Sequence, residues 1–195
     1  VQRRGIEPQE VYKLLPLLAM SIASDIVPVT GENRVLAFYG LRALNARPSV
    51  GIKAIMQVAG IEGKTITISD LVYKIGPRIN AAGRIKSGTE AVRLLITDDA
   101  DAALQFAQDI DSYNQNRRDF DSKTTDEALE QLQNDPMNAS MHTAVVYSPD
   151  WHKGVVGIAA SRLTETYYRP TIVLTAGDDD IISGSARSVS DFDIY

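Results

Sequence analysis

One long stretch of polar, helix-forming sequence sets the architecture of this chain. Near the start of residues 97–134 lie Asp98, Asp99 and Asp101. The helix macrodipole favours acidic side chains at the N-terminal end of a helix. An apolar stripe follows, breaks at the polar residues 114–118 and resumes weakly: Ala103, Leu104, Ala107, Ile110, then Phe120, Ala128, Leu129 and Leu132. A helix of about 36 residues is about 54 Å long. Because a polar helix of that length more often bridges two bodies than packs inside one, we predict a connecting helix here.

The sequence before this helix has helical spacing. An apolar run at 11–23 contains Pro16, which predicts a kink or a late helix start, and the run ends at 25–28. Two further helices are expected at 32–44 and 49–59. The short segment 66–68 fits no element by itself, but Ser69 or Asp70 is expected to cap a helix after it.

The sequence after the long helix changes character. Two short apolar runs, 143–147 and 171–175, flank a helical pattern at 154–168. A turn is expected at 178–180 and a third strand from Ile181 onward. Strand, helix and strand at this spacing predict a right-handed parallel unit. The expected fold class is therefore α/β: a mostly helical N-terminal lobe, a long connecting helix and a small α/β C-terminal domain with a partly parallel sheet.

Composition excludes several functions. The chain of 195 residues has no Cys, which rules out disulfides, thiolate–zinc sites and a thiol nucleophile. With only His142 and His152, a metal site would depend on carboxylates and favour hard ions such as Mg²⁺ or Mn²⁺. No apolar run approaches the roughly 18 residues of a membrane span. The net charge of −5 combines 11 acidic and 3 basic residues within 97–135, a local charge of −8, with a remainder of +3.

The first motif is Gly76–Arg84, with the sequence Gly-Pro-Arg-Ile-Asn-Ala-Ala-Gly-Arg. Two arginines six residues apart among small residues predict a tight loop whose backbone a ligand could approach closely. Arg side chains there would give bidentate hydrogen bonds to phosphate. The alternative is a helix that ends at Gly83, followed by a solvated Arg84.

Two further motifs lie in the C-terminal part. Asp150–Gly157 follows a predicted strand and opens a helix, where open α/β sheets place their ligands and where free backbone N–H groups attract anions. In the alternative, Gly157 serves close helix–sheet packing, Trp151 fills the core and His152 is structural. Ser183–Ser188 combines hydroxyls, a glycine and Arg187 in a plausible phosphate pocket, or else forms an ordinary strand edge.

Asp25 stands at the end of an apolar segment. Its carboxylate could cap the next turn, which Pro28 supports, or ligate a metal. One carboxylate does not make a site by itself, because a divalent ion needs several oxygen donors.

Taken together and in this order, these segments resemble exonucleases of the DHH phosphoesterase family. The resemblance extends over nearly the whole chain, and Gly76–Arg84 is its most specific part. The stretches that carry it are Ser21–Val29 with Gly31–Arg34, Gly76–Arg84, Asp150–Leu163 and Gly184–Ser188.

The resemblance implies an organisation for the chain. Residues 1–96 would be the C-terminal part of a DHH domain, 97–135 the connecting helix and 136–195 a DHH-associated α/β domain truncated at its C-terminus. Asp25 would be a metal ligand, and the residues that bind DNA phosphates would be Arg78, Asn80, Arg84, Ser185 and Arg187. Trp151, His152 and Gly154 match a family motif to which no chemical role is assigned.

The resemblance also implies an activity. The family enzyme uses two Mn²⁺ or Mg²⁺ ions to degrade single-stranded DNA from its 5′ end, releasing 5′-mononucleotides in DNA repair and recombination. The family's other metal ligands, including adjacent histidines, have no counterpart in this sequence. We therefore expect a piece of a longer protein that has no complete catalytic site and is inactive by itself. The expected partners are single-stranded DNA and repair proteins such as a helicase or a single-strand-binding protein, in the cytoplasm and without a membrane.

Two other functions remain open. One is a non-catalytic module that binds a DNA strand or docks to a partner. The other is a DHH-family phosphatase or oligonucleotidase acting on small nucleotides. The associated domain of those enzymes usually carries Gly-Gly-Gly-His, whereas this chain has Gly184-Ser185-Ala186-Arg187, which favours the exonuclease.

Overall fold

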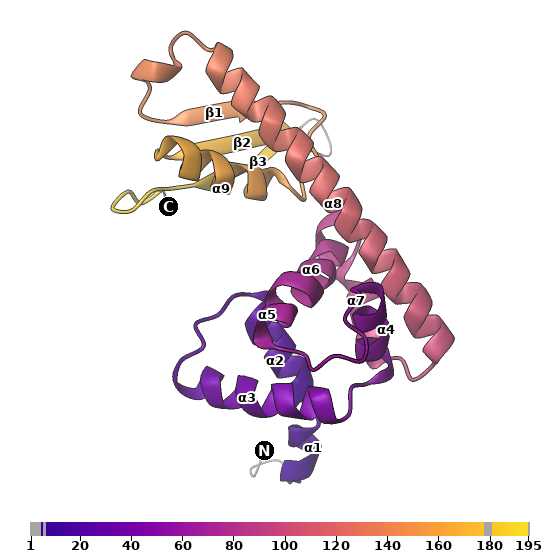
Figure 1. The fold of residues 1–195 in the computed structure, drawn as a ribbon. Helices are drawn as coiled ribbons and strands as arrows, with labels where there is room; N and C mark the ends of the chain where they lie inside the picture. Colours follow the sequence, from indigo (N-terminus) through magenta and orange to yellow (C-terminus); the bar gives the residue numbers. More distant parts are fainter. Residues whose placement is uncertain (1–4, 6, 178–180, 195) are drawn as a thin grey trace. The chain divides into compact units, whose positions relative to one another are not determined.

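The computed structural model describes residues 5, 7–177 and 181–194, and the chain forms two compact units, Val1–Asn114 and Gln115–Tyr195 (Figure 1). The long helix α8 (Ala100–Asn134) is continuous through the boundary and contributes residues to both. The connecting helix predicted over 97–134 is thus confirmed, apart from its first turn. Within the described residues, no helix has both the length and the apolar character required to cross a bilayer.

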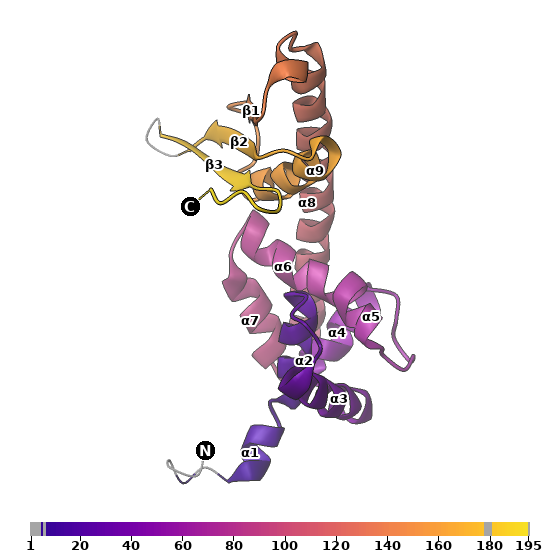
Figure 2. The same ribbon diagram turned by 90° about the vertical axis from the view of Figure 1, so that its left-hand side faces the viewer.

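The first unit is helical. Its elements are α1 (Pro8–Tyr12), α2 (Leu15–Ser24), α3 (Gly31–Ala46), α4 (Val50–Val58), α5 (Ile68–Asp70), the π-helix η2 (Leu71–Ile75), α6 (Gly76–Ile85) and α7 (Gly88–Ile96). Helix α2 packs against α3 and also touches η2 and α6, and Figure 2 shows it between α3 and α6. Side chains from most of these helices form one core, which includes Leu44, Ile55, Ile75, Leu94 and, from α8, Ile110.

Local sequence explains where these helices begin. Pro16 is the second residue of α2, so the late start is the correct interpretation of the proline. The cap of α5 differs from the prediction. Thr67 is the N-cap, and Asp70 is its partner three residues on, each side chain bonding to the other residue's backbone N–H. Ser69 and Asp70 were plausible caps because both residue types favour that position, but Thr67 begins the helix earlier than expected.

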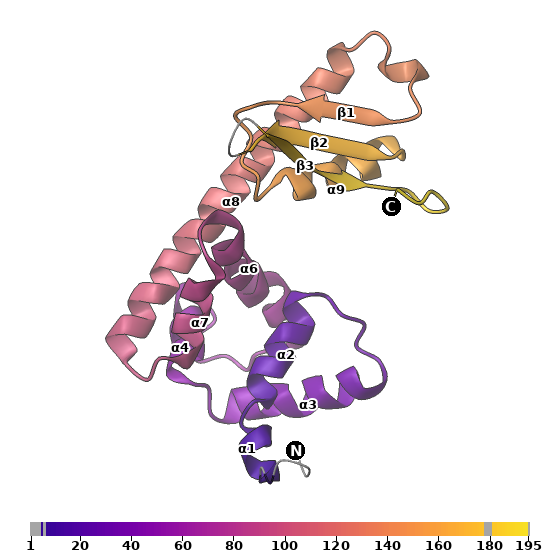
Figure 3. The same ribbon diagram turned by 180° about the vertical axis from the view of Figure 1, so that it is seen from behind.

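The second unit contains a three-stranded sheet. Its strands are β1 (Ala144–Tyr147), β2 (Thr171–Ala176) and β3 (Ile182–Arg187), in the order β1-β2-β3, shown side by side in Figure 3. Strands β1 and β2 are parallel, β2 and β3 antiparallel, and a short 3-10 helix, η3 (Asn138–Ser140), precedes β1. The predicted fold class, with its partly parallel sheet and third strand, is confirmed. The turn expected at 178–180 lies outside the described residues.

Helix α9 (Val156–Tyr167) connects the two parallel strands and packs on β2 and β3. Its buried face includes Ala159 and Leu163, which join Val173 of β2 and Ala128 of α8 in a second core that shares no residue with the first. A half-buried ion pair adds to this contact, since Nη2 of Arg162 donates to the buried carboxylate of Asp121 on α8 at 2.8 Å. The sheet, α9 and the second half of α8 thus form one packed body.

Candidate functional site

Asp25 and Asn80 lie beside one another in the first unit. Asp25 directly follows α2, its side chain is exposed, and it lines a cavity of about 230 Å³ together with Asn80 of α6. The other lining residues are Leu17, Met20, Ser21, Ser24, Ile79 and Leu95. The Asn80 amide donates to the Ser24 carbonyl oxygen at 3.0 Å. Two residues that the sequence singled out, far apart along the chain, are therefore held at one place by a direct bond between α6 and the end of α2.

The segment Gly76–Arg84 is a helix, not the tight loop that its glycines and proline predicted. Pro77 occupies the second position of α6, which follows the π-helix η2 without a break in the helical backbone. Nor does Gly83 end the helix, which continues to Ile85. Gly76 has a packing role instead: a Cβ there would lie 2.9 Å from the Leu71 carbonyl oxygen and 3.0 Å from Ser24 Oγ. The glycine lets α6 approach the end of α2, next to Asp25.

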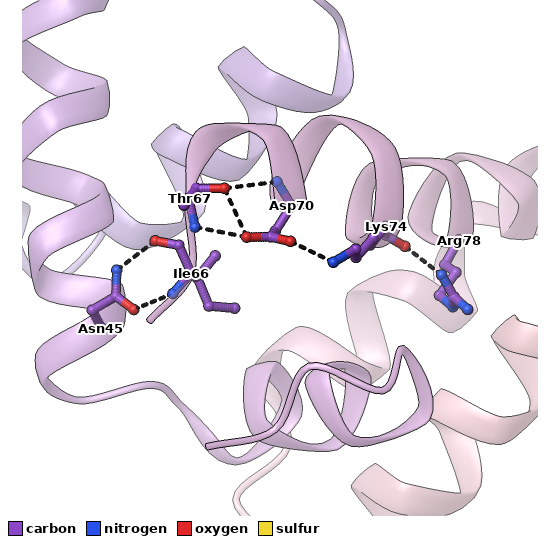
Figure 4. Close-up of polar contacts among 6 residues, drawn as sticks. All are labelled: Asn45, Ile66, Thr67, Asp70, Lys74 and Arg78. Atoms are coloured by element: carbon purple, nitrogen blue, oxygen red, sulfur yellow. Dashed lines mark hydrogen bonds and ion pairs between the residues drawn. The ribbon is translucent and has the colours of Figure 1, made fainter. Parts of the chain in front are cut away.

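Arg78 has its partners inside the first unit. Its Nε donates to Asp111 of α8 at 2.7 Å, and its Nη1 donates to the Lys74 carbonyl oxygen at 2.6 Å. Figure 4 shows that this network continues: the Lys74 ammonium donates to the Asp70 carboxylate, which also accepts from the hydroxyl of its capping partner Thr67. The hydrogen bond from Lys74 is the main cause that lowers the pKa of Asp70. The Arg78 side chain is only 15% exposed, so this arginine holds α6 to α8.

Arg84 lies in a different environment. It is exposed in the last turn of α6, where the helix dipole favours a cation. Lys86 follows two residues later and donates to the Tyr113 hydroxyl at 3.2 Å, which raises the pKa of the lysine. The C-terminal end of α6 thus carries the positive charge of Arg84 and Lys86 at the surface.

Ser185 and Arg187 form the second cluster, on edge strand β3. Arg187 is exposed, and its Nη1 donates to Ser185 Oγ at 3.0 Å and to the Ala186 carbonyl oxygen at 2.7 Å. Its Nε donates to Ser161 Oγ of α9 at 3.1 Å. Within the described part of the chain, Nη2 makes no hydrogen bond. That nitrogen lies 3.3 Å from the position a Cβ would take on Gly157, the second residue of α9.

This geometry suits an anion. The first N–H groups of a helix have no intrahelical partner and carry the positive end of its dipole. Here a guanidinium with one uncommitted nitrogen and a serine hydroxyl lie against the start of α9. Residues 183–187 of the second motif lie in edge strand β3, as one interpretation of that motif predicted. Their polar side chains also reach the start of the helix that the motif at 150–157 opens.

Trp151, His152 and Gly154 serve mainly to build the turn before α9. Trp151 is 4% exposed within the second core, and its indole N–H donates to Glu127 of α8 at 2.8 Å. His152 stacks on Phe120 with ring centroids 5.1 Å apart, and its Nδ1 accepts from the Gly154 N–H at 3.0 Å. These contacts match the structural interpretation of the motif.

The donor set for a metal is incomplete in the described residues. No group of three or more His, Cys, Asp or Glu side chains among them could hold a metal ion. Asp25 supplies one carboxylate to the lining of its cavity. Mg²⁺ and Ca²⁺ take six or more oxygen ligands, so one carboxylate is too few even when waters occupy several of these positions. These residues by themselves therefore do not fit a complete divalent-metal site.

Sequence reasoning assigned no role to Ser161, and it included Gly157 in the predicted anion-binding motif or, in the alternative, gave it a packing role. The two are four residues apart, which places them on one face of a helix, and that spacing was visible. Their shared partner Arg187, at least 26 residues further on, depends on the register between β2 and β3, which single-sequence patterns do not define.

Comparison with known proteins identifies relatives. Residues 138–195 match the model of the DHHA1 domain. The chain is 38% identical over 193 residues to the single-stranded-DNA-specific exonuclease RecJ of Dickeya dadantii, covering 96% of this chain and 33% of that protein. It is 37% identical to RecJ of Escherichia coli, covering 95% and 33%, and 36% identical to RecJ of Bacillus subtilis, covering 94% and 23%.

Solved structures agree with these relatives. RecJ of Thermus thermophilus in complex with Mg²⁺ superposes with a TM-score of 0.83 at 30% identity, covering 99% of this chain and 29% of that one. A crystal structure of exonuclease RecJ bound to manganese gives a TM-score of 0.82, also at 30% identity, and covers 99% of this chain and 46% of that one. The chain spans about a third of the length of the first curated relatives that it matches. The resemblance that the motifs indicated is thus confirmed: over nearly its whole length this chain is similar to one segment of the RecJ exonucleases, and residues 138–195 match the DHHA1 domain model.

Proposed function

We propose that this chain is part of a metal-dependent exonuclease that degrades single-stranded DNA from the 5′ end and releases 5′-mononucleotides in DNA repair and recombination. The observation that carries the proposal is 38% identity to an exonuclease over 96% of the chain, through both units. In this proposal residues 1–96 belong to a DHH domain, 97–135 connect, and 136–195 belong to the associated domain. The protein acts in the cytoplasm, with a helicase or a single-strand-binding protein as candidate partners.

The chain's own residues would bind and orient the strand. Arg187 and Ser185 would hold the 5′-terminal phosphate at the start of α9, using the guanidinium nitrogen that makes no hydrogen bond within the described residues. Arg84 would contact the neighbouring DNA backbone from the surface of α6. Asn80 of the same helix would act next to Asp25, with which it lines a cavity. A terminal phosphate that is held in place sets which end of the strand reaches the reaction centre.

The structure limits two of the proposed roles. Arg78 is paired with Asp111 and its side chain is largely covered, so its contribution to DNA binding would be mainly indirect, through the position of α6. Asp25 would be one ligand of the Mn²⁺ or Mg²⁺ site, and the other ligands would have to come from outside the described residues. When bound, such ions activate water and stabilise charge at phosphorus.

A nuclease assay on 5′-phosphorylated single-stranded DNA with Mn²⁺ tests this proposal. The longer parent protein is expected to release mononucleotides from the 5′ end, whereas the 195-residue chain is expected to release none because one carboxylate does not hold two metals. Asp25→Asn in the parent should abolish digestion, and Asp126→Asn, an exposed acidic residue of α8, should leave it unchanged. Robust 5′ digestion by the purified 195-residue chain would contradict the incomplete site. A parent protein that digests only from the 3′ end would contradict the proposed polarity.

A second candidate is a non-catalytic strand-binding module. It is favoured by the contrast between the two clusters: the polar groups proposed to bind phosphate around Arg187 all lie within the second unit, whereas the described residues of the first unit do not supply a full set of metal ligands. If the parent protein binds 5′-phosphorylated DNA but hydrolyses none with Mn²⁺ or Mg²⁺, this candidate replaces the first. A parent protein that hydrolyses only dinucleotides would instead indicate the oligonucleotidase.

A further inference from the structure

We propose that Ser161 and Gly157 of α9 are positioning residues for the 5′-phosphate, because together they fix the orientation of the Arg187 guanidinium. The inference rests on the proposed function, in which Arg187 meets the terminal phosphate. It adds two residues on a different element, α9, whose effect on the phosphate passes through Arg187.

Ser161 connects the arginine to the helix backbone. Its hydroxyl accepts from Arg187 Nε at 3.1 Å and donates to the Gly157 carbonyl oxygen at 3.1 Å. A hydroxyl has one proton to donate, so the bond to the carbonyl leaves its lone pairs directed away from the helix, toward the arginine. Serine in helices often bonds back to the residue four positions earlier without any tertiary role. Here the same bond gives the oxygen a defined orientation as an acceptor.

Gly157 supplies the space. A Cβ at this position would lie 3.1 Å from Ser185 Oγ and 3.3 Å from Arg187 Nη2, tighter than nearly all real contacts of a Cβ. An added Cβ would require the guanidinium and the serine hydroxyl to move by a few tenths of an ångström away from the start of α9. Gly157 is also in the first turn of the helix, where glycine is otherwise unfavourable compared with alanine. The close approach of two polar side chains explains why a glycine is tolerated there.

The guanidinium is thereby held on three sides. Nε bonds to Ser161, Nη1 bonds to Ser185 and the Ala186 carbonyl, and Nη2 lies over Gly157 with no hydrogen bond inside the described residues. A planar group with two of its three nitrogens committed has little rotational freedom left. The remaining nitrogen is presented in one direction, which reduces the entropy lost when a phosphate oxygen binds.

The experiment measures affinity of the parent protein, with Ca²⁺ replacing Mn²⁺ to suppress cleavage, for a 5′-phosphorylated and a 5′-hydroxyl oligonucleotide of the same sequence. The quantity of interest is the ratio of the two dissociation constants. Ser161→Ala removes the acceptor of Nε, and Gly157→Ala displaces Nη2, so each should reduce the preference for the phosphorylated strand by about tenfold, as expected for one charge-assisted hydrogen bond. Ser161→Thr keeps the hydroxyl and should retain most of the preference.

Controls separate positioning from general damage. Gly88→Ala, at a glycine with nothing within 4 Å of its Cβ position, should leave the preference unchanged. Binding of the 5′-hydroxyl strand should be the same in all variants, because a folding defect would weaken both strands. In the Arg187→Ala background, Ser161→Ala should have no further effect, because its action passes through the arginine.

The outcomes distinguish this inference from the function on which it rests. If Arg187→Ala abolishes the phosphate preference while Ser161→Ala and Gly157→Ala retain it, the positioning role is wrong and the proposed function stands. If Ser161→Ala acts equally with and without Arg187, the serine is merely structural. If Arg187→Ala leaves the preference intact, both the positioning role and the proposed phosphate site are wrong.

Discussion

Arg78 and Arg187 are the same residue type in two different electrostatic settings. Arg78 is largely covered and paired with a carboxylate, so its charge is compensated inside the helical unit. Arg187 is exposed, and its hydrogen-bond partners within the described residues are serine hydroxyls and a backbone carbonyl instead of a carboxylate. An arginine bonded to neutral acceptors keeps its attraction for an anion, whereas the attraction of one that already holds a carboxylate is partly offset by that carboxylate.

This contrast predicts how arginine substitutions act on DNA binding. Arg187→Ala and Arg84→Ala in the parent protein should each weaken binding of a 5′-phosphorylated single strand by ~1–3 kcal/mol, the range for hydrogen bonds to a charged group. Arg47→Ala, at an exposed arginine following α3, should change affinity far less. Titrations at fixed salt measure the effect. Equal affinity of the Arg187→Ala and parent proteins would remove this residue from the binding site.

Asp70 gives the helical unit a defined response to acid. The Lys74 ammonium and the Thr67 hydroxyl and N–H hold the pKa of this carboxyl well below its usual value of 3.8. Because the folded pKa is depressed, the contribution of Asp70 to stability is complete above that usual value and is lost as the pH falls toward the folded value. Asp70→Asn should therefore lower stability at neutral pH by about 1 kcal/mol, the size of a typical cap, and flatten its decline below about pH 4. Urea unfolding followed by circular dichroism from neutral to strongly acidic pH tests this, and an unchanged acid profile would contradict it.

At the scale of elements, α6 shows how one helix uses two glycines differently. Gly76 lies against the carbonyl of Leu71 and the end of α2, whereas the nearest atom to a Cβ on Gly83 would be 3.9 Å away. Gly76→Ala should destabilise the chain by about 1–3 kcal/mol through overpacking. Gly83→Ala should stabilise it by roughly 0.5–1 kcal/mol, because alanine loses less backbone entropy in a helix. Denaturant midpoints of the two variants should move in opposite directions, and a shift in the same direction would show that the contact at Gly76 yields easily.

The elements also show what the sequence could predict. The long helix, the strands and α9 were predictable because their apolar periodicity is decided locally, and the departure of α5 from the prediction is confined to its cap. The prediction of a loop at 76–84 was wrong because glycine and proline usually interrupt helices, whereas here Pro77 lies in the first turn of α6 and Gly76 fits a tight contact. The bonds of Arg78 to Asp111 and of Arg187 to Ser161 link different elements, so no local pattern could have indicated them.

For the whole molecule, the two separate cores predict separate unfolding. The cores share no residue, and the single tryptophan, Trp151, lies in the second one. Tryptophan fluorescence should therefore report on the second unit alone, whereas circular dichroism reports on both. Leu163→Ala should lower the fluorescence midpoint, with a loss of about 2–5 kcal/mol for a buried leucine. Ile55→Ala, in the first core, should shift only the part of the circular dichroism transition that comes from the first unit, and this part has no counterpart in the fluorescence signal. Coincident shifts of both signals in both variants would mean that α8 couples the units into one cooperative transition.

The contact of Gly157 with Arg187 also constrains how such sequences can diverge. A Cβ at position 157 would lie 3.1 Å from Ser185 Oγ and 3.3 Å from Arg187 Nη2, so a lineage that loses both of these side chains releases position 157 to acquire one. In the reverse order, an alanine at 157 would displace the guanidinium while the arginine is still present. Positions 157, 185 and 187 should therefore vary together among homologues, with loss of the two polar side chains on β3 generally preceding loss of the glycine.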